Sequence, residues 1–219
     1  IKEIGDLCKK YNAIFHSDTV QTIAHYPFDL QNLNIDFITA SAHKFHGPKG
    51  VGFIYINENI KIKPLLLGGS QERNMRAGTE NIYAIAGLEK AMQLSCFSMQ
   101  KDMIYVKGLK QYMISQLTKH IDGISFNANS DNLDNSLFKV LSVAFPATPN
   151  SEMLLFNLDI MGVSCSGGSA CTSGSVGGSH VLNAISGDTK KPSVRFSFSK
   201  YNTIQEIDYT IGKLNEIFN

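Results

Sequence analysis

The first part of the chain alternates short apolar runs with polar turns. Apolar residues recur at helical spacing over the first eight positions, which predicts an amphipathic helix. The runs 13–15, 35–40 and 53–56 are bounded by turn residues and predict strands. A second helix is expected from about Asn81 to Leu94. Helices that alternate with buried strands are typical of an α/β fold.

The rest of the chain repeats these elements in a different order. Apolar residues follow helical spacing from Met103 to His120, and the runs 124–126 and 141–145 predict strands. A short helix is expected from Glu152 to Met161. The last helix is expected from Thr203 to Phe218, capped and amphipathic.

A change of domain is expected between Ser95 and Lys101. We therefore predict two domains, residues 1–95 and residues 96–219, the second being a smaller α/β layer domain. The opening helix is typical of the crossover in a β-α-β unit, and the strand that would precede it is missing. We therefore expect the native protein to have residues before Ile1.

The composition argues against several classes of protein. The chain has 219 residues, of which 43% are hydrophobic, and a formal net charge of +1. It can bury a core, and it carries no electric field that would recruit nucleic acid. No apolar run reaches the ~20 residues that a membrane span needs. The four cysteines lack paired metal-site spacing and a secretory context, so we expect reduced thiols, a cytoplasmic location and no metal.

The segment 41–50, Ser-Ala-His-Lys-Phe-His-Gly-Pro-Lys-Gly, places a lysine at the end of an apolar strand. Gly47 and Pro48 turn the backbone before the next strand, so Lys44 is expected to be fixed at a strand end. A lysine among poorly solvated neighbours loses its proton more readily and can attack an aldehyde, which it then holds as an imine. Lys44 is therefore a candidate Schiff-base lysine, and an ordinary loop lysine is the alternative.

A carboxylate ends the preceding apolar run. Asp18 follows residues 13–17, and Gln21 stands three positions later. Open α/β sheets bind ligands outside the carboxyl ends of their strands, and a carboxylate keeps a pyridine nitrogen protonated. Asp18 suits that role, and Gln21 could bond the ring oxygen. Taken alone, Asp18 would be a turn or cap residue; its strand-end position together with Lys44 favours the pyridine site.

Serine and glycine dominate residues 164–180, which contain Cys165 and Cys171. Composition alone would indicate a flexible linker. Apolar segments precede and follow the run, so we expect a long loop inside a domain, and such loops are functional or disordered. A loop that moves a sulfur nucleophile needs this composition, and it offers little apolar surface to bury a thiol.

Arg195 interrupts the apolar face of the strand expected at 193–199. A guanidinium is a planar fork that pairs with a carboxylate at two points, so Arg195 is a candidate clamp for an amino-acid carboxylate. A surface arginine on an edge strand is the alternative.

Together these motifs resemble the cysteine desulfurases of the aminotransferase class V family, which use pyridoxal phosphate to take sulfur from cysteine. The resemblance covers essentially the whole chain. It implies the fold type I of pyridoxal-phosphate-dependent transferases, with a mainly parallel sheet in a partial large domain and a smaller α/β C-terminal domain. Residues 1–95 would be the C-terminal part of the large, cofactor-binding domain, and residues 96–219 would carry the catalytic cysteine loop.

The resemblance also implies roles for single residues. The family pattern S-D-x-x-Q implies that Asp18 pairs with the pyridine nitrogen and Gln21 with the ring oxygen. The pattern S-x-H-K implies that Ser41 and His43 contact the cofactor phosphate and that Lys44 holds the cofactor.

Three further roles follow from the same resemblance. The family segment R-[AS]-G-T implies that Thr79 reaches the partner subunit's cofactor phosphate in a homodimer, although a plain helix cap would have the same sequence. The phrase G-S-A-C-T-S-G-S implies that Cys171 attacks the substrate sulfur and carries it as a persulfide. Cys165 is then structural, or a disulfide partner of Cys171 on oxidation, and Arg195 binds the substrate carboxylate.

The implied reaction converts L-cysteine to L-alanine and supplies sulfur for iron–sulfur clusters or thio-cofactors through an acceptor or scaffold protein. A selenocysteine lyase, another class V aminotransferase, and a non-catalytic fragment that binds a sulfur acceptor are the alternatives. The amino-terminal part of the family is missing from this chain. We therefore expect the chain alone to bind pyridoxal phosphate weakly and to show little or no activity.

Overall fold

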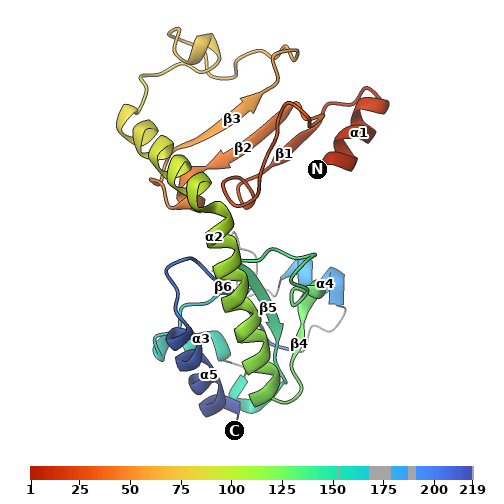
Figure 1. Cartoon of the computed structure of the whole chain (residues 1–219), viewed down its shortest axis with the longest axis vertical. Coiled ribbons are helices and arrows are strands. Elements are labelled where there is room, and N and C mark those ends of the chain that lie inside the picture. The colour runs from red at the N-terminus through yellow and green to blue at the C-terminus, as the bar shows by residue number, and fades with distance from the viewer. Residues whose placement is uncertain (152, 168–178, 187–190, 219) are drawn as a thin grey trace. The chain divides into compact units, whose positions relative to one another are not determined.

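The computed structural model describes residues 1–151, 153–167, 179–186 and 191–218 (Figure 1). The chain divides into two compact units, Ile1–Met99 (unit 1) and Gln100–Asn219 (unit 2). The assignment of residues 1–95 and 96–219 to functional domains stays a prediction. In chain order the elements are α1 (Lys2–Lys10), β1 (His16–Asp18), β2 (Phe37–Ser41), η1 (Ala42–Phe45), β3 (Gly52–Ile56), η2 (Glu72–Asn74), α2 (Ile82–His120), β4 (Ser125–Phe126), η3 (Asn127–Asn129), β5 (Val140–Ala144), η4 (Pro149–Ser151), α3 (Leu154–Ile160), α4 (His180–Ser186), β6 (Ser193–Ser197) and α5 (Ile204–Phe218).

Unit 1 contains a three-stranded sheet in the order β1-β2-β3. Strands β1 and β2 are parallel, with Asp18 opposite Thr39, whereas β2 and β3 are antiparallel, with Ser41 opposite Gly52. The strands predicted from the runs 35–40 and 53–56 and the α/β class are confirmed. The strand expected from the run 13–15 lies just after it, at His16–Asp18, and the sheet described here is mixed rather than mainly parallel. The reason lies in the connection 42–51, which is too short for the crossover that a parallel strand requires.

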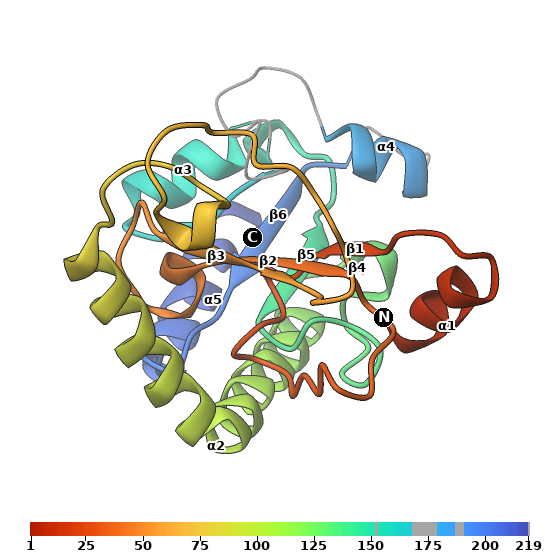
Figure 2. The same ribbon diagram turned by 90° about the horizontal axis from the view of Figure 1, so that it is seen from above.

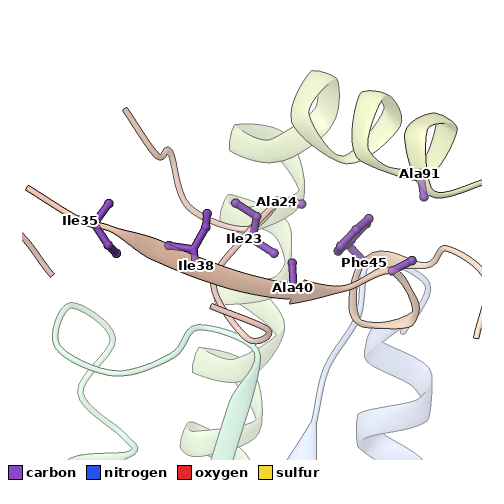
Figure 3. Packing of buried hydrophobic residues seen from close by; sticks show 8 residues of the cluster. Ile23, Ala24, Ile35, Ile38, Ala40, Phe45 and Ala91 are labelled. Atoms are coloured by element: carbon purple, nitrogen blue, oxygen red, sulfur yellow. The ribbon is translucent and has the colours of Figure 1, made fainter. Parts of the chain in front are cut away.

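One face of this sheet carries the core of unit 1. Ile38 and Ala40 alternate with half-buried residues along β2 and are 1% and 5% exposed. Figure 3 shows them gathered with Ile23, Phe45 and Ala91. Helix α2 packs against this cluster through Ala91, Leu88 and Met92, and a Cβ at Gly87 would overlap Pro48.

The opposite face of the same sheet is more open. Thr39 and Ser41 are half-buried on it, and Ile54, which pairs with Thr39, is 53% exposed. Figure 2 shows the strands nearly edge-on, with the first turns of α2 on one side and the segment 57–81 on the other. This open face carries Asp18 and Ser41, two of the polar residues that the sequence singled out.

The predicted opening helix is confirmed as α1. Gly5 is its buried residue, because a Cβ there would overlap the carbonyl oxygen of Asn34. Asn34 also donates its side-chain amide to the carboxylate of Asp6, at 2.6 Å. Ile4 and Leu7 on the helix remain exposed.

Helix α2 corrects the sequence analysis. Two helices were expected, ending near Leu94 and beginning near Met103, but residues Ile82–His120 form one helix of 39 residues. No proline interrupts this stretch. Relative to alanine, each polar residue between Ser95 and Lys101 makes a helix less stable by only about 0.5 kcal/mol. None of the helices in the described part of the chain, α2 included, has both the length and the hydropathy of a membrane span.

Unit 2 contains an antiparallel sheet in the order β4-β5-β6. The buried face of this sheet carries Leu141 and Val143 from β5 and Val194 and Phe196 from β6. Buried apolar residues also recur at helical spacing on both long helices of the unit: Val106, Leu109, Met113 and Leu117 on α2, and Ile207, Ile211, Leu214 and Ile217 on α5. These residues form the core of unit 2.

The predicted C-terminal helix is confirmed as α5, and its start is capped reciprocally. The Glu206 amide donates to the Thr203 hydroxyl at 3.3 Å, and the Thr203 amide donates to the Glu206 carboxylate at 2.8 Å. This is a capping box, which satisfies two helix-end donors. The Glu206 carboxylate accepts hydrogen bonds from the Thr203 amide and from the Asn202 side chain. These two bonds, the first most strongly, lower the pKa of Glu206.

Lys110 on α2 is completely buried in unit 2. Its Nζ donates to the Ser136 hydroxyl at 2.7 Å and to the Leu137 carbonyl oxygen at 2.9 Å. Burial lowers the pKa of the Lys110 amine, because a charge is poorly solvated there. Lys110 thus ties the segment before β5 to the helix.

Candidate active site

Asp18 lies at the carboxyl end of β1, where the strand turns away from the sheet. The next residue, Thr19, is buried and bonds the Thr39 carbonyl oxygen through both its amide (3.0 Å) and its hydroxyl (2.8 Å). The Asp18 Oδ1 accepts a hydrogen bond from the Val20 amide at 2.9 Å. Among the described residues, Oδ2 has no partner, so one carboxylate oxygen is oriented and the other remains available.

Ser41 lies near Asp18 on the open face of the sheet. Asp18 pairs with Thr39, and Ser41 stands two residues further along β2, so the three side chains share one face. The partner of Ser41 on β3 is Gly52, where a Cβ would overlap the Ala40 carbonyl oxygen. No side chain therefore fills the surface beside Ser41 on that strand. The Ser41 hydroxyl makes no hydrogen bond within the described part of the chain.

Lys44 lies on the 3-10 helix η1, directly after β2. The residues on either side of His43 and Lys44 anchor this turn, because Ala42 and Phe45 are completely buried. His25 Nε2 lies 3.0 Å from the Lys44 carbonyl oxygen and holds the backbone from a second side. The Lys44 side chain is half-buried, and among the described residues its Nζ pairs with no carboxylate or carbonyl.

Gln21 and Thr79 lie in exposed turns of unit 1. Thr79 precedes α2, but the helix is capped by Asn81, whose side-chain oxygen accepts from the Ala84 amide at 3.2 Å. The Thr79 hydroxyl is therefore not needed as a cap. This disfavours the plain-cap alternative for the R-A-G-T segment.

The turn before Thr79 has unusual backbone. Three consecutive residues, Glu72, Arg73 and Asn74, adopt left-handed φ angles of 47°, 55° and 64°. The Gly78 amide donates to the Gln71 side chain at 3.1 Å and closes the loop. Strained backbone of this kind is concentrated at functional sites.

Arg195 lies on β6 in unit 2, opposite Ser142 on β5. Its Nε is buried and has no hydrogen-bond partner in the described residues. On the other side of β6 its backbone pairs with Ser166. The Arg195 amide donates a hydrogen bond to the Ser166 carbonyl oxygen at 2.6 Å, and the Ser166 amide donates one to the Arg195 carbonyl oxygen at 3.2 Å. An unpaired, buried guanidinium nitrogen indicates a missing acceptor.

Arg195 also lines a cavity of about 230 Å³ in unit 2. The other lining residues are Ser142, Ser179, Val181, Leu182, Ser193 and Val194. Cys171 lies outside the described residues. Of the described residues nearest to it in sequence, Ser166 pairs with Arg195 and Ser179 lines the same cavity.

Cys165 lies in a different environment from the one a nucleophile needs. Burial, with a contribution from the nearby Asp159 carboxylate, raises the pKa of the Cys165 thiol to about 11. Such a thiol stays protonated at neutral pH and reacts slowly. This supports a structural role for Cys165.

A larger cavity, of about 460 Å³, lies at the start of α5 in unit 2. Several of its polar groups already have partners: the Asn202 side chain accepts from the Ser199 amide, the Tyr209 hydroxyl donates to the Met161 carbonyl oxygen, and Glu206 caps the helix. Arg195 does not line this cavity. It is therefore a weaker candidate for the substrate.

The polar groups at the ends of β1 and β2 fit a phosphorylated pyridine. The Asp18 carboxylate comes from the end of β1, and the Ser41 hydroxyl and the Lys44 amine come from the end of β2 and from η1. Each has an atom without a partner among the described residues. Within the described ranges, no three His, Cys, Asp or Glu side chains are close enough to share a metal ion.

Comparison with known proteins identifies the family. Residues 1–210 match the family model of aminotransferase class-V, so the chain belongs to that family. It is 40% identical over 220 residues to the cysteine desulfurase IscS of Dictyoglomus turgidum, covering 99% of this chain and 55% of that protein. It is 44% identical over 210 residues to the putative cysteine desulfurase IscS 1 of Bacillus subtilis, with 94% and 54% covered.

Solved structures agree with this family. A NifS-like protein from Rickettsia africae matches with 31% identity and a TM-score of 0.84, over 99% of this chain and 57% of that one. A second NifS-like protein matches with 35% identity and a TM-score of 0.85, over 99% and 56%. The chain thus spans about half the length of the relatives it matches. The predicted resemblance and the fold type are confirmed, and pyridoxal phosphate is the cofactor of this family.

Two residues that the sequence analysis missed support the site. His25 holds the backbone of Lys44, and the buried Asn127 bonds two serines of the Arg195 cavity. Both contacts join residues far apart in the sequence, and neither residue belongs to a recognisable motif. Sequence patterns therefore gave no signal for them.

Proposed function

We propose that this chain is part of a pyridoxal-phosphate-dependent cysteine desulfurase, which converts L-cysteine to L-alanine and transfers the sulfur to Cys171. The main support is the register of β1 and β2, which brings Asp18 and Ser41 to one face of the sheet, directly before Lys44. Family membership and the names of the relatives support the same reaction.

Three residues would hold the ring of the cofactor. Lys44 is the residue to which the cofactor aldehyde would attach, since its Nζ has no competing partner in the described residues. Asp18 would pair with the pyridine nitrogen through its available carboxylate oxygen, and Gln21 with the ring oxygen. Bound pyridoxal phosphate supplies an electron sink that makes the α-proton of the substrate acidic.

Ser41 and His43 would contact the phosphate from within the subunit. Thr79 would contact the phosphate of the partner subunit, because its hydroxyl is not used as a helix cap. We infer a homodimer on this basis. Large exposed apolar side chains in unit 1, such as Leu65 and Leu67, agree with an association of chains.

Lys44 and Cys171 would carry the proton and sulfur transfers. When the substrate amine takes the place of Lys44 at the cofactor, the Lys44 amine would be free to accept the α-proton of the substrate as general base. The Cys171 thiolate attacks the substrate sulfur, the Cβ–S bond breaks, and Cβ receives a proton. The products are L-alanine and a persulfide on Cys171, and no external oxidant or reductant is needed. Arg195 binds the substrate carboxylate.

The persulfide sulfur would pass to an acceptor or scaffold protein in the cytoplasm, for iron–sulfur cluster or thio-cofactor synthesis. The formal net charge of the chain is only +1 at pH 7. An acceptor would therefore be recognised by a local surface rather than by the overall field of the protein.

The test uses the full-length protein that contains this chain. We expect L-cysteine to yield equal amounts of alanine and Cys171 persulfide, and C171S to abolish the persulfide but retain the cofactor. Borohydride reduction followed by peptide mapping should place the pyridoxyl group on Lys44, with K49A as a matched control that keeps it. Label on Lys49, or persulfide formation by C171S, would show that the assignment is wrong. Turnover of selenocysteine alone would favour the lyase alternative.

A further inference from the structure

The cavity beside Arg195 contains two serines bridged by a buried amide. We propose that Ser142 and Ser193, oriented by Asn127, donate hydrogen bonds to the substrate carboxylate alongside Arg195. This inference rests on the function proposed above and extends it by two binding residues and one positioning residue.

The four side chains come together on one face of the β5–β6 sheet. Ser142 pairs directly with Arg195, and Ser193 lies two residues before Arg195 on β6, so the three share a face. Asn127, from η3, is 7% exposed. Its Nδ2 lies 3.1 Å from the Ser142 hydroxyl oxygen and 3.1 Å from that of Ser193.

These contacts determine where the serine protons can go. The Asn127 amide nitrogen has two hydrogens and donates one to each serine oxygen. Each serine is then an acceptor toward Asn127 and keeps its own hydroxyl proton for another partner. Among the described residues, neither hydroxyl donates to any acceptor, and both serines line the cavity.

The chemistry of the cavity favours an anion. Arg195 contributes a positive charge and a buried Nε without a partner, and the serines contribute two further donors. No Asp or Glu is among the described residues that line the cavity. A carboxylate can accept all three hydrogen bonds, since its two oxygens offer about four acceptor positions. The volume of about 230 Å³ suits a small amino acid.

A neighbouring serine shows what a purely structural hydroxyl looks like here. The Ser130 hydroxyl donates to the Ser142 carbonyl oxygen at 2.8 Å and accepts from the Ser142 amide at 3.1 Å. Its hydrogen-bonding capacity is used by the backbone. Ser142 and Ser193 differ because their protons are not used within the described protein.

The experiment measures binding by calorimetry in the full-length protein loaded with pyridoxal phosphate. The probes are L-alanine and ethylamine, which differ by the carboxylate. We expect S142A and S193A each to raise the Kd of L-alanine about tenfold and to leave that of ethylamine unchanged. N127D should have at least the effect of both together, because its carboxylate accepts the serine protons and repels the ligand. S142T keeps the hydroxyl and should bind L-alanine as the wild type does.

The matched control is S130A, which removes two hydrogen bonds to the same strand. It should lower the melting temperature and leave the Kd of L-alanine unchanged. Unchanged binding in S142A and S193A, or an equal loss for both probes, would overturn the inference, as would a wild type that binds both probes equally. Cysteine turnover is measured in parallel. If the protein turns over cysteine but S142A and S193A bind L-alanine as tightly as the wild type does, this inference alone is rejected. If these variants lose affinity for L-alanine and not for ethylamine, but the protein does not turn over cysteine, the proposed desulfurase activity is rejected.

Discussion

The sheets of the two units are covered to different extents. In unit 2, Leu117, Leu141 and Leu214 come from three different elements and are completely buried. In unit 1, Ile38 is 1% exposed on one face of the sheet, whereas Ile54 on the other face is 53% exposed. Unit 2 thus has a complete core, and unit 1 covers one side of its sheet.

The residues with candidate chemistry follow the same difference. Asp18 and Ser41 lie on the open face of unit 1, and Lys44 follows on η1; each has an atom without a partner among the described residues. Arg195 and Ser142 lie in a cavity that unit 2 forms from its own residues. The comparison indicates that the cavity proposed for the substrate carboxylate is formed by unit 2 alone, whereas the surface proposed for the cofactor ring is open within unit 1.

The largest effect is expected in thermal unfolding when the two units are produced as separate fragments. Residues 100–219 should fold alone and unfold cooperatively on heating, because most of the deeply buried side chains lie there. Residues 1–99 alone should unfold at a lower temperature and less sharply, since few of the fully buried large side chains lie there. Circular dichroism melts and amide chemical-shift dispersion measure both. A cooperative melt of residues 1–99 at the same temperature would remove the distinction.

Within unit 1, two isoleucines test the two faces of the sheet. Ile38→Ala should lower the free energy of unfolding of the whole chain by about 2–5 kcal/mol, because it leaves a cavity in the core. Ile54→Ala is the matched control, with an expected change within about 0.5 kcal/mol. Urea denaturation measures both variants. Equal losses would show that the second face is also covered.

In unit 2, Lys110 tests how stability depends on pH. Its pKa is lowered in the folded state from the ordinary value of 10.5, so the unfolded chain binds more protons just below that pH. The contribution of Lys110 to the free energy of unfolding is therefore greatest above pH 10.5 and is lost as the pH falls through the lowered folded pKa. Lys110→Met should be more destabilising near pH 10 than at pH 7.

The control for Lys110 is Lys107→Met on the same helix. It removes an exposed ion pair of 2.8 Å with Asp134, which solvent screens, so only a small loss of stability is expected, with no increase toward pH 10. Urea melts at both pH values compare the variants. A penalty for Lys110→Met that is constant with pH would mean that its amine is as well solvated as in the unfolded chain.

The smallest effect is expected at Cys165. Because its thiol pKa is raised to about 11, iodoacetamide should label it slowly up to pH 9 and rapidly only near pH 11. Mass spectrometry of the C171S variant measures this, with the exposed Cys96 as the accessible reference. Cys165→Ser should leave cysteine turnover nearly unchanged. A large loss of turnover would identify Cys165 as the nucleophile instead.

Much of the fold could be predicted because it is recorded in local patterns. Alternating burial along β2 and the spacing of Ile207, Ile211 and Leu214 on α5 follow directly from apolar periodicity. The strand-end positions of Asp18 and Lys44 were predictable for the same reason. Their roles toward the cofactor stay proposals, as does that of Cys171.

Other features depend on contacts that local patterns do not record. The continuity of α2 follows from the absence of a helix breaker, which the polar residues after Ser95 concealed. Asn127 meets Ser142 and Ser193 across 15 and 66 residues of sequence, so its role emerges only when the sheet has formed.

The left-handed turn at residues 72–74 has a consequence for protein engineering. Each L-residue other than glycine pays about 1–2 kcal/mol for this conformation, and glycine adopts it freely. Glu72→Gly and Arg73→Gly are therefore direct routes to higher thermostability. These glycines would also remove a carboxylate and a guanidinium from the turn, so a loss of activity in either variant would show that the removed side chain contributes to function.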